Sequence, residues 1–343
     1  MKLFRIIFLA MAAIAALASC QKGPSSKAPE QSVPIRLVVG LNDHFSTRAT
    51  GVESNSAAGE SKVNSLQVFV FNGDVLDGYG TSSNSLSATV SCSSGQRDIY
   101  CVTNVPSLAS VTSKSTLLSQ VAQLSESPSS FGMFGKLLNQ SLEADGSLSV
   151  DVYRFAGRVV IKSIVNALAN EAQAAAFTLD AVYLTNVAGD VEFEHTGSQS
   201  YVVSQWYNRK GYEADNNLGS FTYDAVGSAV ASGATHQVPH YFYTMPNAEN
   251  AAVGGDTFTP RRCRLVIKAT IAGVANYYPI LLPAIEGCKS YEINSVTLTR
   301  PGNHDDDEYP EEKPIEGFDQ GFQVQVQDWN VVLLGDSNGN ITI

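Results

Sequence analysis

The chain has 343 residues, a formal net charge of −11 at pH 7, and only 16% charged residues against 44% hydrophobic ones. A protein that binds nucleic acid needs a basic face, so this acidic balance argues against nucleic acid as a partner. Beyond the N-terminal segments, roughly 300 residues remain, which suit two domains better than one.

The N-terminal residues 1–20 have the pattern of a secretion signal. Two basic residues, Lys2 and Arg5, precede an uncharged apolar run that is too short to cross a bilayer comfortably. The run ends in LASC, which matches the lipobox of bacterial lipoproteins, so we expect lipid attachment at Cys20. The alternative is an ordinary signal peptide with a chance cysteine. Residues 21–31, rich in Pro, Ser and Lys, indicate a tether.

Nearly every periodic segment after the tether has period two, which is typical of β-strands. Residues 33–41 place five apolar side chains on one face: Val33, Ile35, Leu37, Val39 and Leu41. Residues 66–71 form an apolar run that ends at the turn signal Asn72-Gly73. We expect further strands in SLSATVSC, IYCVTNV, SLSVDVYR, RVVIKSI, FTLDAVYLTNV, HYFYTM, RLVIKATI, YYPILLP, YEINSVTLT and FQVQVQDWNVVLL. Many short strands at such spacing predict β-sandwiches.

Helical signals are few, and the predicted fold class is all-β with two Greek-key sandwiches. Residues 114–125 and 166–176 are each expected to form a short helix on a strand connection, the second from alanine propensity alone. We place the domain boundary near Arg154, with an N-terminal sandwich over 49–154 and a C-terminal one over 155–343.

Four cysteines remain beyond Cys20: Cys92, Cys101, Cys263 and Cys288. An exported chain meets an oxidising compartment, so disulfides are possible. Pairing of near neighbours, 92 with 101 and 263 with 288, is the first choice among three connectivities. Buried free thiols are the alternative.

No catalytic motif stands out, so the sequence favours a non-enzyme. It contains no Gly-x-Ser-x-Gly elbow, P-loop, Gly-x-Gly-x-x-Gly or Cys-x-x-Cys. The HQVPH stretch, from His236 to His240, has metal-ligand spacing only if it is helical, which Pro239 disfavours. The acidic stretch 303–317, with seven acidic residues and two prolines, is expected to be a solvated loop. Its clustered carboxylates would also suit calcium, but it lacks the calcium-binding frame. We expect neither a metal nor a cofactor.

Segments spread over the whole chain resemble the fimbrillin family, the FimA-type subunits of type V pili. The segments are the lipobox, VPIRLVVGL, STRAT, KVNSLQVFVFNGDVLDGY, YCVTNVP, YRFAGRVVIKSI, HYFYTMPNA, RRCRLVIKATIAGVANYYPILLP, YEINSVTLTRPG and VQVQDWNVVLL. The resemblance implies two transthyretin-like β-sandwiches, exported as a lipoprotein to the outer membrane and displayed in a surface fimbrium. Its implied partners are other fimbrial subunits and, at the surface, a host or bacterial receptor.

The resemblance also implies a maturation route. In this family an arginine-specific protease cleaves after the first strand, and a neighbouring subunit donates its C-terminal segment into the vacated groove. Carried onto this sequence, residues 32–48 are the first strand and cleavable loop, and the cut falls between Arg48 and Ala49. The donor lies within residues 321–343.

The residues themselves support such an exchange. If the apolar face of residues 33–41 fills the N-terminal core, it holds on the order of ten kcal/mol of burial, and its loss would expose a groove with unpaired sheet edges. A replacement strand should match its alternation, and the tail offers Trp329, Val331 and Leu333. The alternative is that 322–329 is the last core strand of the C-terminal domain. Head-to-tail exchange does not close, so it makes filaments.

Two other functions stay open. A lipid-anchored surface protein that never polymerises would bind glycans, with Trp206 and Tyr207 in a sugar-stacking platform. A fimbrial anchor would keep its lipid and not polymerise. Cleavage at Arg48 distinguishes both from a polymerising subunit.

Overall fold

Strands dominate the computed structural model, as the period-two patterns predict. It describes residues 33–41, 60, 62–127, 130–194, 202–209, 221–254, 257–315, 325–327, 331–334, 336 and 338–343. Residues 34–343 form one unit, with two sandwiches that follow each other along the chain. The predicted all-β fold class is confirmed. None of the described helices is long and apolar enough to span a membrane.

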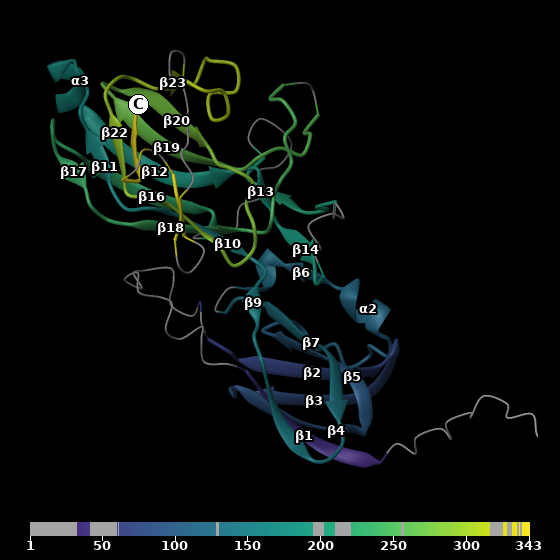
Figure 1. Ribbon diagram of the computed structural model, residues 1–343. Helices are drawn as coiled ribbons and strands as arrows, with labels where there is room; N and C mark the ends of the chain where they lie inside the picture. Colours follow the sequence, from purple (N-terminus) through teal and green to yellow (C-terminus); the bar gives the residue numbers. More distant parts are fainter. Residues whose placement is uncertain are drawn as a thin grey trace, which may run out of the picture. The chain divides into compact units, whose positions relative to one another are not determined.

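The N-terminal sandwich has a three-stranded and a five-stranded sheet. The first has the order β4-β1-β8 and the second β3-β2-β5-β7-β9 (Figure 1). Their bounds are β1 Pro34–Leu41, β2 Ser65–Asn72, β3 Val75–Ser83, β4 Ser87–Ser93, β5 Gly95–Thr103, β7 Met133–Leu142, β8 Gly146–Val150 and β9 Tyr153–Arg154.

Glycines allow the two sheets of this sandwich to approach closely at both corners. A Cβ on Gly80 of β3 would lie 2.4 Å from the Thr89 carbonyl oxygen of β4, and one on Gly135 of β7 would lie 2.1 Å from the Asp151 carbonyl oxygen. No other residue fits such an approach without a shift of the backbone. The corners therefore fix the sheets around the core that β1 helps to fill.

The C-terminal sandwich has two layers. One consists of two successive sheets, β18-β10-β21-β25-β24 and β17-β11-β22-β26, and the other is β16-β12-β19-β20-β23. Their bounds are β10 Gly157–Ile161, β11 Ile164–Asn166, β12 Phe177–Thr185, β16 Tyr223–Ala229, β17 Thr235–His236, β18 His240–Thr244, β19 Arg264–Ile271, β20 Val274–Leu281, β21 Ser290–Ile293, β22 Ser295–Leu298, β23 Asn303–His304, β24 Gln325–Gln327, β25 Val331–Leu333 and β26 Asn340–Thr342.

Short elements join the two halves of the chain. Strand β6 (Val121–Gln123) of the N-terminal half pairs with β14 (Asp190–Glu192) of the C-terminal half. Strand β13 (Val187–Ala188) pairs with β15 (Trp206–Tyr207) within the C-terminal half. One apolar core continues across Arg154, because Phe69 and Tyr100 belong to the same buried cluster as Val159 and Ile267. The chain therefore changes sandwich near Arg154 without a break in the core.

The helices are shorter than predicted. Helix α2 spans Lys114–Leu118, with Ser113 as its N-cap, and α3 spans Glu171–Ala175, with Asn170 as its N-cap. The predicted helix over 114–125 is wrong beyond residue 118, where the chain forms β6 and the 3-10 helix η2 (Leu124–Glu126). Pairing of β6 with β14 there outweighs the local helix propensity.

Candidate functional site

Strand β1 is the central strand of its sheet. It pairs antiparallel with β4, from Pro34 opposite Ser93 to Gly40 opposite Ser87, and parallel with β8, from Leu37 opposite Gly146 to Leu41 opposite Val150. In Figure 1 it is the purple strand beside β4. Without β1, the strands β4 and β8 would face each other across an open gap. We call this space, which β1 fills between β4 and β8, the groove.

Alternate side chains of β1 enter the N-terminal core. Ile35, Leu37, Val39 and Leu41 are at most 7% exposed, and they pack with apolar residues of β2, β4, β5 and β8. The expectation that Val33 joins this face is wrong, because Val33 is 58% exposed. It precedes the first paired residue, Pro34, and so lies beyond the end of the groove.

Polar contacts mark both ends of β1. At its start, opposite Pro34, Ser93 donates to Asp77 through its backbone N–H and its hydroxyl at 2.8 and 2.9 Å, and Arg97 Nε donates to Asp77 Oδ2 at 2.7 Å. At its end, the Leu41 N–H donates to the Leu86 carbonyl at 2.7 Å. The two ends of the groove therefore differ in their polar groups.

The lead-in to β2 is fixed on the C-terminal half by Glu60. This carboxylate is 3% exposed; its Oε1 accepts from the Tyr243 hydroxyl at 2.6 Å and its Oε2 lies 3.1 Å from Arg158 Nη1. Its backbone carbonyl accepts from Arg154 Nε at 2.7 Å. Burial and the neighbouring Glu60 charge raise the pKa of Tyr243, so the hydroxyl remains a donor. We call Glu60, Arg154, Arg158 and Tyr243 the clasp.

Sequence reasoning missed the clasp, although Arg158 carried a signal. An arginine at the start of the apolar run GRVVI must find a partner when the run is buried. The partner, 98 residues away, could not be read from the sequence.

The predicted donor segment lies on the C-terminal sandwich of its own chain. Strand β25, which contains Val331 and Leu333, pairs parallel with β21, and β26 pairs parallel with β22. Leu334, Ile341 and Ile343 are buried, and among the described strands β24 lies at the sheet edge and pairs with β25. Trp329 lies outside the described residues, as do Cys20, Arg48 and Ala49.

The predicted disulfides are absent, because Cys92, Cys101, Cys263 and Cys288 are all free. Cys92 lies on β4 and Cys101 on β5, in opposite sheets of the sandwich. The Cys263 carbonyl bonds Leu282, whereas the Cys288 N–H bonds Ala156. Closeness in sequence therefore did not bring the thiols together.

The proposed sugar platform is buried. Trp206 is 6% and Tyr207 8% exposed; the Trp206 indole donates to the Val203 carbonyl at 3.2 Å, and its ring lies 5.4 Å from that of Phe258. These rings therefore serve the core.

The acidic stretch is held on the sandwich rather than solvated throughout. Glu312, 1% exposed, lies 3.0 Å from Arg261, and the Tyr277 hydroxyl donates to Asp305 at 2.5 Å. The prediction of a solvated loop holds for residues 304–308, which are exposed, and is wrong at Glu312, which the buried Arg261 attracts. Among the described residues, no three His, Cys, Asp or Glu side chains are grouped to hold a metal ion.

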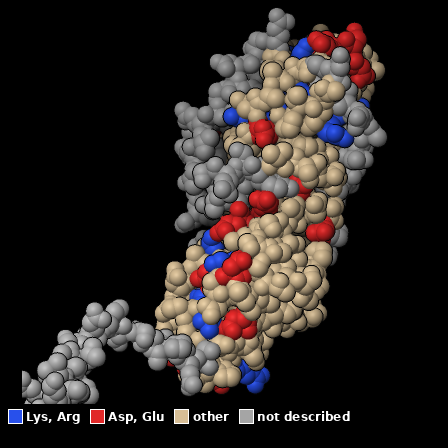
Figure 2. Space-filling model, turned by 90° about the vertical axis from the view of Figure 1, so that its right-hand side faces the viewer, with Lys and Arg blue, Asp and Glu red and all other residues tan. Residues whose placement is uncertain are grey.

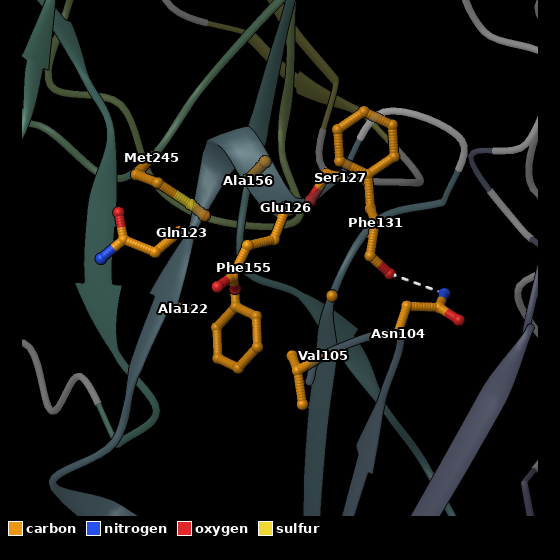
Figure 3. A pocket seen from close by; sticks show the side chains of 11 residues that line it. Asn104, Val105, Ala122, Gln123, Glu126, Ser127, Phe131, Phe155, Ala156 and Met245 are labelled. Atoms are coloured by element: carbon orange, nitrogen blue, oxygen red, sulfur yellow. Dashed lines mark hydrogen bonds between the residues drawn. The ribbon is translucent and has the colours of Figure 1, made fainter. Parts of the chain in front are cut away.

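Among the described residues, two of the cavities where the halves of the chain meet differ greatly in size. The one in Figure 3, beside the Asn104 amide that donates to the Phe131 carbonyl at 2.9 Å, has a volume of about 10 Å³. That is room for one water molecule. The other, about 640 Å³, is an open cleft over Phe134, Phe155 and Phe193. On the face in Figure 2, acidic and basic side chains of the described residues are interspersed among uncharged surface, without a broad basic area.

Comparison with known proteins agrees with this fold and extends it to a family. Residues 33–144 match the model of the major fimbrial subunit protein (FimA) family. The matched residues make up the N-terminal sandwich up to the start of β8. The region that matches the FimA model includes β1 and β4 but not β8, and the resemblance to fimbrillins is confirmed. This match to a fimbrial subunit family agrees with the prediction of a non-enzyme.

Solved structures share the fold of both sandwiches. A protein assigned to cell adhesion from Bacteroides eggerthii is 20% identical with a TM-score of 0.60, over 82% of this chain and 92% of that one. The fimbrilin FimA of Porphyromonas gingivalis is 16% identical with a TM-score of 0.55, over 78% and 90%. No curated protein matches the sequence significantly.

Proposed function

We propose that this chain is an exported, lipid-anchored fimbrial precursor that polymerises by strand exchange after cleavage between Arg48 and Ala49. In this proposal β1 leaves with the lipid on Cys20, and the C-terminal segment of another subunit takes its place. The observation that supports it is the central position of β1, because a sheet that loses its middle strand must regain one.

The energetics make exchange demanding. Burial of the four inward side chains of β1 contributes roughly 6 to 12 kcal/mol, which is comparable to the stability of a whole domain. A subunit without β1 would expose an apolar groove flanked by β4 and β8. Only a strand of matching alternation, such as one from the tail, restores both the core and the main-chain hydrogen bonds.

Cleavage removes a strong advantage of the resident strand. Eighteen residues, 42–59, connect β1 to the clasp. While this connection is intact, β1 returns to its groove at an effective concentration on the order of millimolar, which a donor from another subunit cannot match. After the cut, β1 and the donor strand compete for the groove as separate molecules, and a β1 that leaves the groove is diluted away.

Before exchange, the proposed donor segment is part of its own C-terminal sandwich. In this structure β25 and β26 complete the C-terminal sandwich, with Leu334, Ile341 and Ile343 buried. Exchange therefore moves the tail from its own sandwich to a neighbour's groove. Deletion of residues 330–343 would remove core side chains as well as the donor, so it is a poor test of donation.

The N-terminus of surface material tests the proposal. We expect surface filaments to begin at Ala49, and an Arg48→Ala precursor to accumulate as acylated monomers. Arg36→Ala is the matched control, because Arg36 is an exposed residue of β1 on the outer face; it should leave processing intact. Filaments of undiminished length from the Arg48→Ala chain would refute the proposal.

A non-polymerising anchor is the second candidate. The same surface material distinguishes it, because an anchor would retain Cys20 and its lipid at the N-terminus. The glycan-binding function loses its proposed platform, since Trp206 and Tyr207 are buried.

A further inference from the structure

Two histidines of the HQVPH stretch meet although the stretch is not helical. His236 ends β17 and His240 begins β18, so the turn through Pro239 places both rings at the same side of one layer. Their Nε2 atoms are 3.1 Å apart and their ring planes are 14° from parallel. The sequence-based argument that i, i+4 spacing requires a helix to bring the rings together is therefore wrong.

A carboxylate from the other layer completes the arrangement. Asp224 of β16 places Oδ2 2.7 Å from His240 Nδ1. The His240 side chain is 2% exposed and that of Asp224 is 49% exposed. Strands β16, β17 and β18 are each the edge strand of a sheet, so Asp224, His240 and His236 join the edges of both layers. We call these three residues the relay.

Protons fit the relay in a definite order. The Asp224 carboxylate accepts a hydrogen bond, so Nδ1 of His240 carries a proton, and Nε2 of neutral His240 then accepts from Nε2–H of neutral His236. The relay can hold one added proton. His240 then donates from Nδ1 to Asp224 and from Nε2 to His236, whose Nε2 has become the acceptor. A second added proton leaves two N–H groups and two positive charges facing each other across 3.1 Å.

We propose that the relay is a pH-sensitive lock that joins the edges of the C-terminal sandwich near neutral pH and releases them in acid. Among the described residues, the titratable groups that act on His236 are His240 and Asp224. The strands paired with the histidines present apolar residues opposite them, Ile164 to His236 and Ile161 to His240. No described carboxylate other than Asp224 therefore compensates a second charge.

The direction of titration agrees with the lock. Burial, and then the neighbouring His240, lower the pKa of His236 below its ordinary value, while Asp224 opposes the shift. The unfolded chain then binds more protons than the folded one just below about pH 6.5, so the folded state loses stability as the pH falls from that value toward the folded pKa.

Hydrogen exchange on the full chain tests the lock. Between about pH 7.5 and about pH 5, after correction for intrinsic rates, we expect exchange in β16–β18 to accelerate roughly tenfold more than in β19 and β20. His236→Gln should abolish the difference, because the amide can still donate to His240 but gains no charge. His304→Gln, at an exposed histidine on β23, is the matched control and should behave like the parent.

Two exchange results would overturn the proposal: equal acceleration in all strands of the parent, or an unchanged acid response in His236→Gln. Ring-nitrogen NMR of the parent chain gives an answer even if a variant folds poorly. We expect His236 to take up its proton below about pH 6.5. Independent titration of both histidines near that value would equally exclude the lock.

Discussion

Glu60 and Arg158 are 98 residues apart in the sequence, yet Oε2 of Glu60 lies 3.1 Å from Nη1 of Arg158. Glu60 is also the first described residue after β1, and this ion pair holds it on the C-terminal half of the chain. In the proposed maturation, everything before it can be cut without loss of the junction between the two sandwiches.

Replacement of Glu60 by Gln should destabilise the folded chain by about 2 to 4 kcal/mol, because Arg158 loses a buried partner. The loss is limited because Arg158 retains Glu292, 3.4 Å from its Nη2. Thermal or urea unfolding measures the change. Glu143→Gln, at an exposed position, is the control and should be nearly neutral. Equal stability of the two variants would exclude a structural role for the clasp.

A disulfide across the outer face of β1 should stop polymerisation without affecting cleavage. Val38 and Thr89 face each other in the antiparallel pair and are both exposed, so Val38→Cys with Thr89→Cys can be bridged. We expect cleaved monomers under oxidising conditions and filaments after reduction, both visible on native gels.

The control for this lock is a bridge in the other sandwich. Thr178→Cys with Ala229→Cys joins β12 to β16 and leaves β1 free. Filaments should form from this variant with or without reductant. If the Val38–Thr89 bridge also permits filaments, β1 does not need to leave.

Loss of the Asp77 carboxylate should weaken the end of the groove. Asp77→Asn removes the charged partner of the buried Arg97 and should cost about 1 to 3 kcal/mol at neutral pH. Burial alone would raise the Asp77 pKa, but the hydrogen bonds from Arg97 and Ser93 outweigh it and lower the pKa. The contribution is therefore present above about pH 4 and is lost as the pH falls through the folded pKa.

Stability curves of the two chains measure this effect. Their difference should be constant near neutral pH and shrink below about pH 4. A difference that persists unchanged at lower pH would assign the effect to packing rather than charge.

The described cysteines should react as free thiols of unequal accessibility. Burial raises the pKa of Cys92 to about 11 and of Cys101 to about 12, and it raises the pKa of Cys263 as well, so these thiols are protonated at neutral pH. In a Cys20→Ser chain, maleimide should label the half-buried Cys288 first, and the rest only after unfolding. Cys288→Ser should remove the fast phase, and a disulfide found by mass would contradict the structure.

Local patterns predicted much of the fold, and partners distant in sequence account for what they missed. The alternation of residues 35–41 was enough to predict β1 and its buried face, because period two is a property of the strand itself. The ion pair of Glu60 with Arg158, the approach of His236 to His240 and the separation of Cys92 from Cys101 depend on how strands are ordered in the sheets. The helix over 114–125 ended early for the same reason, when β14 paired with its second half.

Mixed pairing around β1 has a consequence for the polarity of a filament. A strand that enters the gap between β4 and β8 in either direction gains one antiparallel and one parallel ladder, because those two neighbours run in opposite directions. The side-chain sites, spaced by two residues, read the same both ways. Direction must then be chosen at the ends of the groove, by the Asp77–Ser93–Arg97 contacts at one and the Leu86 carbonyl at the other. These few atoms would decide which way successive subunits point.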